Sequence, residues 1–363
     1  MLFDEYRFRT GALLKNRVAL APLTNKQSHS DGRCSEAERR WLRRRAEGGF
    51  GAIMTCAAHV TSDGQTWDGQ LGCFGDELVP GLAKLAEGLR TTGTLPFVQL
   101  YHGGARATPR LTHTQPWSAS PFDDAAPGFV PPRPARETDL ERVIQAFADA
   151  ARRARDAGFA GVEIHGAHGF LISQFLSGTV NRRTDRWGGS LDNRARLARC
   201  VTQAVRSAVS SDFCVGMRLS AEDGGWACGM DLDESLQVAR WLAEDGADFV
   251  HLSLWDVTRN TSKRPDQHPV TLFRAALPSD VAIVAAGNVW SRTDAENTLA
   301  RGADVIALGK AAILNPDWPL RAAEPEFEPE RGPIEPHALR ELAISSPFAD
   351  YLRTFDGLVT DGR

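Results

Sequence analysis

Two histidines, His165 and His168, stand close together in the segment IHGAHG, directly after a short apolar run. Two neutral imidazoles at this spacing can direct hydrogen-bond donors at one oxygen atom, which would polarise a carbonyl group or bind a phenolate. Two other interpretations stay open on residue types alone. Glu163 shares a strand face with His165, so the three side chains could ligate a metal ion. The histidines could also be a structural pair whose hydrogen bonds are satisfied internally.

Other polar residues occur where packing alone would not need them. Gln99 and Arg218 lie in the apolar runs PFVQLY and GMRLS. A buried amide can read the edge of a planar heterocycle because it offers both a donor and an acceptor. The guanidinium of Arg218 could stabilise negative charge on a bound cofactor, or it could form a structural pair with Glu163.

Two glycine-containing pairs, Gly287-Asn288 and Gly309-Lys310, follow the last two apolar runs. Glycine lets backbone N–H groups approach an anion closely, and Lys310 adds a positive charge. This pattern favours a phosphate site, although glycines can also simply close the ends of strands.

The elements that must position these residues repeat along the chain. Short runs rich in apolar and β-branched residues predict buried strands, with helical patterns between most of them. The strand runs are 17–20, 52–56, 96–101, 161–165, 214–219, 247–252, 281–285 and 303–308, and the clearest helical patterns are 35–47, 79–92, 140–157, 194–209 and 234–244. This alternation predicts an eight-stranded parallel (β/α)8 barrel, a TIM barrel, in preference to an open doubly wound sheet. In such a barrel the active site lies at the C-terminal ends of the strands, where the polar residues described above fall.

Three segments depart from this alternation. The connection 103–139 is rich in proline and glycine, and its length predicts a lid or substrate wall. A second long polar loop spans 175–193. We expect residues 1–320 to form the barrel and residues 321–363 to form a C-terminal tail that packs on it.

Composition excludes several classes of protein. The formal net charge of −4 gives no basis for binding nucleic acid or an anionic membrane. None of the 6 cysteines has a CxxC spacing, so we expect no zinc site, no dense disulfide framework and no iron–sulfur cluster. The N-terminus lacks an apolar signal core, and no run of about 18 apolar residues occurs. We therefore expect a cytoplasmic protein that acts on a small-molecule substrate and could form a homo-oligomer.

Five segments together resemble the old yellow enzyme family of flavin-dependent NAD(P)H oxidoreductases. They are LLKNRVALAPLTN (13–25), PFVQLYHGGAR (96–106), GVEIHGAHGFLISQFLSGTVNRRTDRWGGSLDNR (161–194), GMRLS (216–220) and ADVIALGKAAILNPDW (303–318). The resemblance runs from about residue 2 to about residue 320, with a weaker echo at 344–358. It implies FMN as the cofactor and NADH or NADPH as the hydride donor. The chain has no cysteine cluster for an iron–sulfur domain, so it resembles the compact, FMN-only branch.

The resemblance also implies a role for each polar strand end. The loop that contacts the flavin ring would be Ala21, Pro22, Leu23 and Thr24; the contacts to its pyrimidine edge would be Ala57 and Gln99; the cation near N1 and O2 would be Arg218; and the phosphate cradle would be Gly287, Asn288, Gly309 and Lys310. His165 and His168 would be the catalytic pair that binds the carbonyl or nitro oxygen of the substrate, with Tyr101 and Phe170 beside them. This favours oxygen-binding histidines over a metal site.

Two residues depart from the family pattern. Phe170 stands where the family usually has a tyrosine that protonates the substrate. Lys310 stands where the phosphate site usually has arginine, which keeps the charge but loses the planar fork. We do not expect Tyr101 to replace the missing acid, because the family ordinarily carries another aromatic residue there.

The implied activity is that of an ene-reductase, which passes hydride through flavin N5 to an activated alkene, a quinone or a nitro compound. Two alternatives stay open: a flavin-dependent desaturase or oxidase that uses the same site, and a flavin-binding or aromatic-ligand-binding protein with low turnover. The sequence does not determine the natural substrate, the choice between NADH and NADPH, the source of the proton or the oligomeric state.

Overall fold

The protein is described by a computed structural model that covers residues 1–124, 128–222 and 229–360. Its centre is a closed barrel of parallel strands in the order β10-β11-β12-β3-β4-β5-β8-β9. The strands are β3 (Val18–Leu20), β4 (Ala52–His59), β5 (Leu95–Tyr101), β8 (Gly161–His165), β9 (Cys214–Ser220), β10 (Phe249–Ser253), β11 (Ala282–Ala286) and β12 (Val305–Leu308). Because β12 pairs with β3, the sheet has no open edge, which confirms the predicted (β/α)8 barrel and excludes an open sheet.

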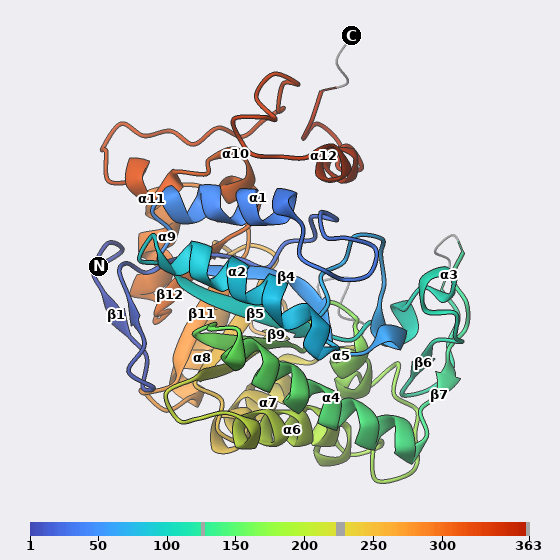
Figure 1. The fold of residues 1–363 in the computed structure, drawn as a ribbon. Helices are drawn as coiled ribbons and strands as arrows, with labels where there is room; N and C mark the ends of the chain where they lie inside the picture. Colours follow the sequence, from blue (N-terminus) through green and yellow to red (C-terminus); the bar gives the residue numbers. More distant parts are fainter. Residues whose placement is uncertain (125–127, 223–228, 361–363) are drawn as a thin grey trace.

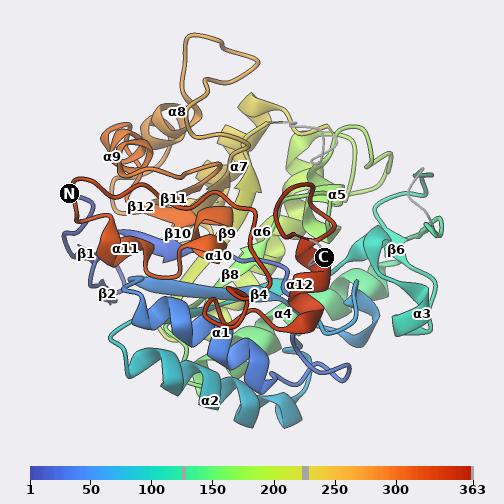
Figure 2. The same ribbon diagram turned by 90° about the horizontal axis from the view of Figure 1, so that it is seen from above.

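Helices surround the barrel, as Figures 1 and 2 show. The main ones are α1 (Glu36–Glu47), α2 (Val79–Arg90), α4 (Glu137–Asp156), α6 (Leu191–Ala208), α7 (Leu232–Glu244), α8 (Pro269–Ala276) and α9 (Arg292–Ala300). Three of them begin two or three residues before the predicted start, namely α4, α6 and α7. The reason is that an apolar pattern marks only the buried face, whereas the first turn is set by polar caps. Ser190 accepts a hydrogen bond from the Asn193 amide, and Asp231 accepts from the amides of Asp233 and Glu234.

The N-terminal end of the barrel is filled with apolar side chains. The antiparallel hairpin of β1 (Tyr6–Arg7) and β2 (Leu13–Leu14) carries Phe8, whose ring lies 6.1 Å from that of Phe97 and 6.0 Å from that of Phe249. These residues belong to a cluster that occupies the barrel interior. Polar side chains inside the barrel are therefore concentrated toward the opposite, C-terminal end.

The segment 103–139 folds on one side of that C-terminal end. It contains η3 (Gly104–Arg106), α3 (Pro109–Thr112), β6 (Trp117–Ser118) and β7 (Arg133–Pro134). It is fastened to α5 (Leu171–Leu176) by Gln174, whose Oε1 accepts hydrogen bonds from the Ser118 hydroxyl at 2.8 Å and the Ala105 amide at 3.1 Å. That this segment acts as a lid stays a prediction.

The tail contains α12 (Ser346–Leu352), which lies above α1 in Figure 1. It follows two short helices, α10 (Lys310–Leu314) and α11 (Trp318–Arg321). The buried ring of Phe348 packs edge-on against Trp41 of α1, with ring centroids 5.3 Å apart. The Arg45 guanidinium donates to the Leu342 carbonyl at 2.7 Å, so the tail is attached to α1 at two points.

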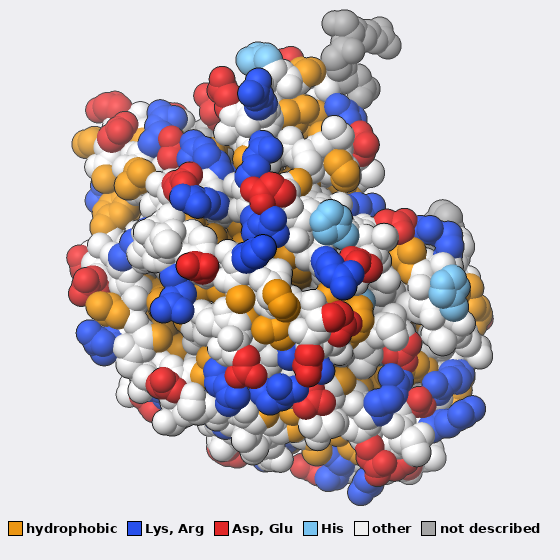
Figure 3. All heavy atoms as spheres, in the orientation of Figure 1, with side chains coloured by type: hydrophobic (Ala, Val, Ile, Leu, Met, Phe, Trp, Pro, Cys, Tyr) orange, Lys and Arg blue, Asp and Glu red, His pale blue; other side chains and the backbone are white. Residues whose placement is uncertain are grey.

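The surface shown in Figure 3 carries basic and acidic side chains side by side, as the small net charge suggests. Within the three described ranges, no helix is both long and apolar enough to span a membrane.

Candidate active site

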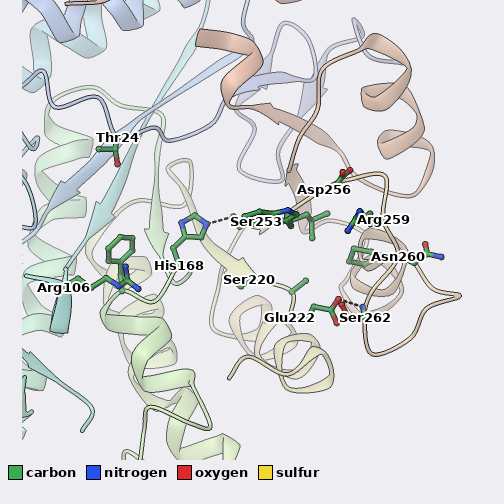
Figure 4. A pocket seen from close by; sticks show the side chains of 15 residues that line it. Thr24, Arg106, His168, Ser220, Glu222, Ser253, Asp256, Arg259, Asn260 and Ser262 are labelled. Atoms are coloured by element: carbon green, nitrogen blue, oxygen red, sulfur yellow. Dashed lines mark hydrogen bonds between the residues drawn. The ribbon is translucent and has the colours of Figure 1, made fainter. Parts of the chain in front are cut away.

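A cavity of about 570 Å³ opens at the C-terminal end of the barrel. Figure 4 shows Thr24, Arg106 and His168 on one side of it, and Ser253 next to His168. Phe170 also lines this cavity. The wall therefore combines side chains from the loops after β3, β5, β8 and β10, as expected for a barrel active site.

The two histidines lie side by side at the end of β8. Their ring centroids are 5.0 Å apart and their planes are nearly perpendicular, at 87°. The turn that follows β8 places His168 at a φ of 63°, a left-handed conformation that costs energy for a residue with a side chain. Gly166 is required in this turn because an added Cβ would lie 2.9 Å from the Arg218 carbonyl oxygen. The backbone is thus strained locally to present both imidazoles at one place.

Both imidazoles are neutral at physiological pH. Burial lowers the pKa of His165 well below its usual value, and the nearby His168 and Arg218 lower it further. Burial also lowers the pKa of His168 well below its usual value, with Arg218 and His251 adding to the effect. A neutral imidazole carries one N–H donor and one acceptor nitrogen, so each ring can donate one hydrogen bond.

Ser253, at the end of β10, connects His168 to the cation below it. Its hydroxyl oxygen lies 2.6 Å from His168 Nε2 and accepts a hydrogen bond of 3.1 Å from Arg218 Nη2. Sequence analysis missed Ser253. The signal was present, because a serine that directly follows an apolar run falls at the catalytic end of a barrel strand.

A second network lies inside the barrel mouth. Glu163 accepts a hydrogen bond from Gln99 Nε2 at 2.7 Å and lies 2.6 Å from Nδ1 of His251, a residue that sequence analysis also missed. Arg218 donates a hydrogen bond to Ser253, and its positive charge also attracts the carboxylate of Glu163. Glu163 therefore turns toward Gln99 and His251, away from a shared site with His165 and His168. Among the described residues, no cluster of three or more His, Cys, Asp or Glu side chains is placed to hold a metal ion.

Phe170 and Tyr101 lie against His165. The Phe170 ring is 5.1 Å from that of His165 and 4.6 Å from that of Tyr101. Tyr101 is fully buried, and its hydroxyl forms a hydrogen bond of 2.7 Å with Thr66. Burial raises the pKa of Tyr101 far above its usual value. Phe170 thus lines the cavity, whereas Tyr101 packs against the Phe170 ring.

The loop after β3 places Thr24 on the cavity wall and anchors itself through Ala21, whose amide donates to the Leu308 carbonyl at 3.0 Å. Pro22 and Leu23 are half-buried between these two residues. The strand register places Ala57 of β4 beside Gln99 of β5.

The predicted phosphate residues lie at the ends of two neighbouring strands, β11 and β12. Asn288 has a φ of 49° and donates to Asp256 at 3.1 Å, which fixes the loop after β11. At Gly309 an added Cβ would have only Leu23 near it, at 3.7 Å, so the space above this residue is open. The exposed Lys310 lies beside it, with Nζ 5.8 Å from the ring of Phe355 in the tail. Gly287 precedes Asn288 and directly follows β11.

Two buried polar atoms show that this mouth fits a planar polar cofactor. Within the described chain, Arg218 Nε and His251 Nε2 are buried and have no hydrogen-bond partner. A buried donor or acceptor without a partner is costly, so these two atoms, which lie together at the barrel mouth, favour a polar ligand there. The donor Arg218, the amide of Gln99 and the open space at Gly309 suit the ring and the phosphate of FMN.

The fold and this site define a flavin-binding barrel oxidoreductase. Residues 2–326 match the NADH:flavin oxidoreductase / NADH oxidase family, and the chain belongs to it. It is an FMN-dependent NAD(P)H oxidoreductase of the old yellow enzyme type, which confirms the predicted class and cofactors.

Individual relatives agree with this assignment. The chain is 34% identical to a probable NADH-dependent flavin oxidoreductase, YqiG, of Bacillus subtilis, over 89% of this chain and 88% of the relative. It is 34% identical to an NADPH dehydrogenase of Bacillus licheniformis, over 90% of this chain and 95% of the relative. Among solved structures, the old yellow enzyme homologue from Zymomonas mobilis superposes with a TM-score of 0.83 at 26% identity, over 96% of this chain and 99% of that one.

Proposed function

We propose that the protein passes hydride from NADH or NADPH, through FMN held at the barrel mouth, to an activated alkene, a quinone or a nitro compound. The observation that carries this proposal is a pair of neutral histidines, of which His168 lines an open cavity and His165 lies beside it, with ring centroids 5.0 Å apart. Neutral donors at one place suit an oxygen atom on which negative charge develops.

The cofactor, when bound, supplies a ring that accepts hydride from the nicotinamide and returns it to the substrate. Thr24, Ala57, Gln99 and Arg218 would hold that ring, with Ala21, Pro22 and Leu23 in the adjoining loop, and Gly287, Asn288, Gly309 and Lys310 would hold the phosphate. Arg218 places a fixed positive charge in the mouth, where negative charge accumulates on reduction.

His165 and His168 orient the substrate by donating hydrogen bonds to its carbonyl, quinone or nitro oxygen. These bonds strengthen as hydride reaches the substrate, so they lower the barrier more than they improve ground-state binding. Removal of one donor of this kind typically costs about 10²–10³ in rate.

The side chains around the cavity contain no obvious proton donor at the family position. Phe170 has no O–H group, and the hydroxyl of Tyr101 is buried on Thr66. Water that enters the open cavity would supply the proton. Substrates whose reduced anions are stable, such as quinones and nitroalkenes, are therefore the preferred class.

Phenol binding tests the histidine pair. Phenols should bind the oxidised FMN-loaded protein as phenolates and give a long-wavelength charge-transfer band, because two N–H donors lower the pKa of a bound phenol. The double variant His165→Ala/His168→Ala should retain FMN and lose the band. An unchanged band and affinity in that variant would refute the assignment.

Anaerobic titration tests the reaction. Each nicotinamide is added to the FMN-loaded protein, and the reduced protein is then mixed with a quinone, a nitroalkene or cyclohexenone. Fast reduction and fast reoxidation support the proposal. Bound FMN that neither nicotinamide reduces would instead indicate a ligand-binding protein. In a separate aerobic assay, oxygen-driven conversion of a saturated ketone that is faster than the reverse reaction would indicate a desaturase.

A further inference from the structure

Three buried side chains form a continuous hydrogen-bonded network beneath the barrel mouth. His251 of β10 lies with Nδ1 2.6 Å from Glu163 Oε2, and Gln99 of β5 donates its Nε2 to Glu163 Oε1 at 2.7 Å. His251 and Glu163 are fully buried, and Gln99 is 2% exposed. Hydrogen bonds between buried polar groups are strong at the low local dielectric, so they hold these side chains in one arrangement.

The contact between Glu163 and His251 spans an intervening strand. Glu163 of β8 is in register with Gly216 of β9, which in turn is in register with Phe249 of β10. Gly216 has no side chain, and an added Cβ would lie 2.4 Å from the ring of Phe249. The glycine therefore leaves room for the ring of Phe249, and β9 contributes no side chain at the level of Glu163.

The charge states in this hydrogen-bonded network depend on burial and on neighbouring charges. Burial would raise the pKa of Glu163, but His251, Arg218 and Gln99 outweigh it and hold that pKa below its usual value, so the side chain is a carboxylate. Burial lowers the pKa of His251, while Glu163 opposes the effect and Arg218 adds to it. Whether neutral or protonated, a ring whose Nδ1 faces a carboxylate carries a proton on Nδ1 and donates it.

The orientation of the Gln99 amide is a consequence. A carboxylate only accepts hydrogen bonds, so the NH₂ group of Gln99 must face Glu163. The carbonyl oxygen of Gln99 then points the other way. If a neutral group replaced the carboxylate, the amide could adopt either of its two flipped orientations.

We infer that His251 and Glu163 are positioning residues that hold the Gln99 amide with its carbonyl oxygen toward the cofactor, as the acceptor for the single N–H donor on the pyrimidine edge of FMN. The inference rests on the proposed placement of that edge at Gln99. Neither His251 nor Glu163 touches the reacting atoms in this arrangement. They act through Gln99, and by orienting its amide they determine the affinity and the position of the bound flavin ring.

The test measures FMN itself. Apoprotein is reconstituted with isotope-enriched FMN, the Kd is obtained from the quenching of flavin fluorescence, and the N3–H resonance is recorded by NMR. In Glu163→Gln, which keeps the size of the side chain, the Kd should rise about tenfold, the value of one hydrogen bond. The N3–H proton should also move upfield toward its position in free FMN, a change that a purely structural role would not produce.

A pair of histidine variants provides the matched control. His251→Leu should raise the Kd and shift the N3–H resonance in the same direction as Glu163→Gln, whereas His251→Gln, which can still donate to Glu163, should restore both. His59 of β4 is also a buried histidine with Nδ1 hydrogen-bonded, to the Thr61 carbonyl at 2.9 Å, and with Nε2 unpaired among the described residues. His59→Leu should change neither the Kd nor the resonance.

The outcomes separate this inference from the proposed function. An N3–H resonance and a Kd that stay at wild-type values in both Glu163→Gln and His251→Leu would refute the positioning role of Glu163 and His251. That result would not contradict the proposed roles of the histidine pair or hydride transfer. If His251→Leu does not fold, the milder Glu163→Gln decides the matter. A wild-type protein whose bound FMN shows no hydrogen-bonded N3–H would refute the placement at Gln99 itself.

Discussion

At the scale of single residues, Phe170 is the side chain with the most direct chemical consequence. It lines the cavity and packs against His165, it has no proton to give, and the hydroxyl of Tyr101, whose ring lies 4.6 Å from that of Phe170, is buried on Thr66. In the proposed reaction, protonation at carbon would therefore depend on solvent.

Phe170→Tyr should raise the turnover of cyclic enones. A positioned general acid is commonly worth about 10²–10⁴ in rate, and a tyrosine here would place its hydroxyl at the cavity wall. The measurement is stopped-flow rates of the two half-reactions separately, with oxidation of NAD(P)H expected to stay nearly constant. Equal rates with cyclohexenone and a quinone in wild type, together with no gain in the variant, would mean that another acid is present.

The neutral histidine pair predicts a flat pH profile. The pKa values of His165 and His168 are lowered well below 6.5, so the neutral form prevails at every pH above those lowered values, and protonation would begin only in more acidic solution. We expect the rate constant for quinone reduction to stay constant from about pH 6 to pH 8. A titration step near pH 6.5 that disappears in His165→Ala or His168→Ala would contradict the assigned neutral state.

At the scale of elements, the site is built where three neighbouring strands end. His168 follows β8, Arg218 lies on β9 and Ser253 ends β10, and the hydroxyl of Ser253 joins the other two. Adjacent parallel strands bring their C-terminal ends to one edge, so residues distant in sequence meet there without any long loop.

Ser253→Ala should weaken phenolate binding without releasing FMN. The change removes the hydroxyl that contacts His168 Nε2, so the ring loses a contact worth roughly 0.5–1.5 kcal/mol, which corresponds to a Kd for phenol about two- to tenfold higher. Ser220→Ala is the matched control, because Ser220 lies directly opposite Ser253 in the strand register and lines the same cavity. Equal increases in the Kd for phenol in the two variants would show that the effect comes from a change in the cavity wall and not from the contact between Ser253 and His168.

At the scale of the whole molecule, the tail joins the outside of the barrel to its mouth. Phe348 is buried on Trp41 of α1, and farther along the tail Tyr351 faces the Thr24 side chain while Phe355 lies near Lys310. The same segment that packs on α1 thus touches the loops after β3 and β12, where FMN is expected.

Phe348→Ala should destabilise the protein and weaken FMN binding together. Truncation of a fully buried phenylalanine typically costs about 3–5 kcal/mol, and the loosened tail would no longer hold Tyr351 and Phe355 in place. Denaturant unfolding and FMN titration measure the two effects. Leu320→Ala is the control, since this side chain is 59% exposed and its loss should change stability by only about 0.5 kcal/mol. Unchanged FMN affinity in Phe348→Ala would show that the tail is only a structural support.

The sequence by itself determined the barrel and several of the polar residues at its mouth. Eight apolar runs alternating with helical patterns predicted the closed sheet, because strand and helix periodicity are local properties that the chain order displays directly. The polar residues that follow those runs, such as Gln99, His165 and Arg218, were predictable because strand ends in this fold meet at one edge. Their individual roles toward FMN and substrate stay predictions.

Only the tertiary structure decided which of these side chains touch. The contact between Glu163 and His251 joins side chains of β8 and β10 across β9, and the link from His168 to Arg218 depends on Ser253 from a third strand. Tyr101 is fully buried, and its hydroxyl forms a hydrogen bond with Thr66, which lies 35 residues away in the sequence. Such contacts are set by strand register and side-chain length across the barrel, and neither quantity is visible in the local pattern of one segment.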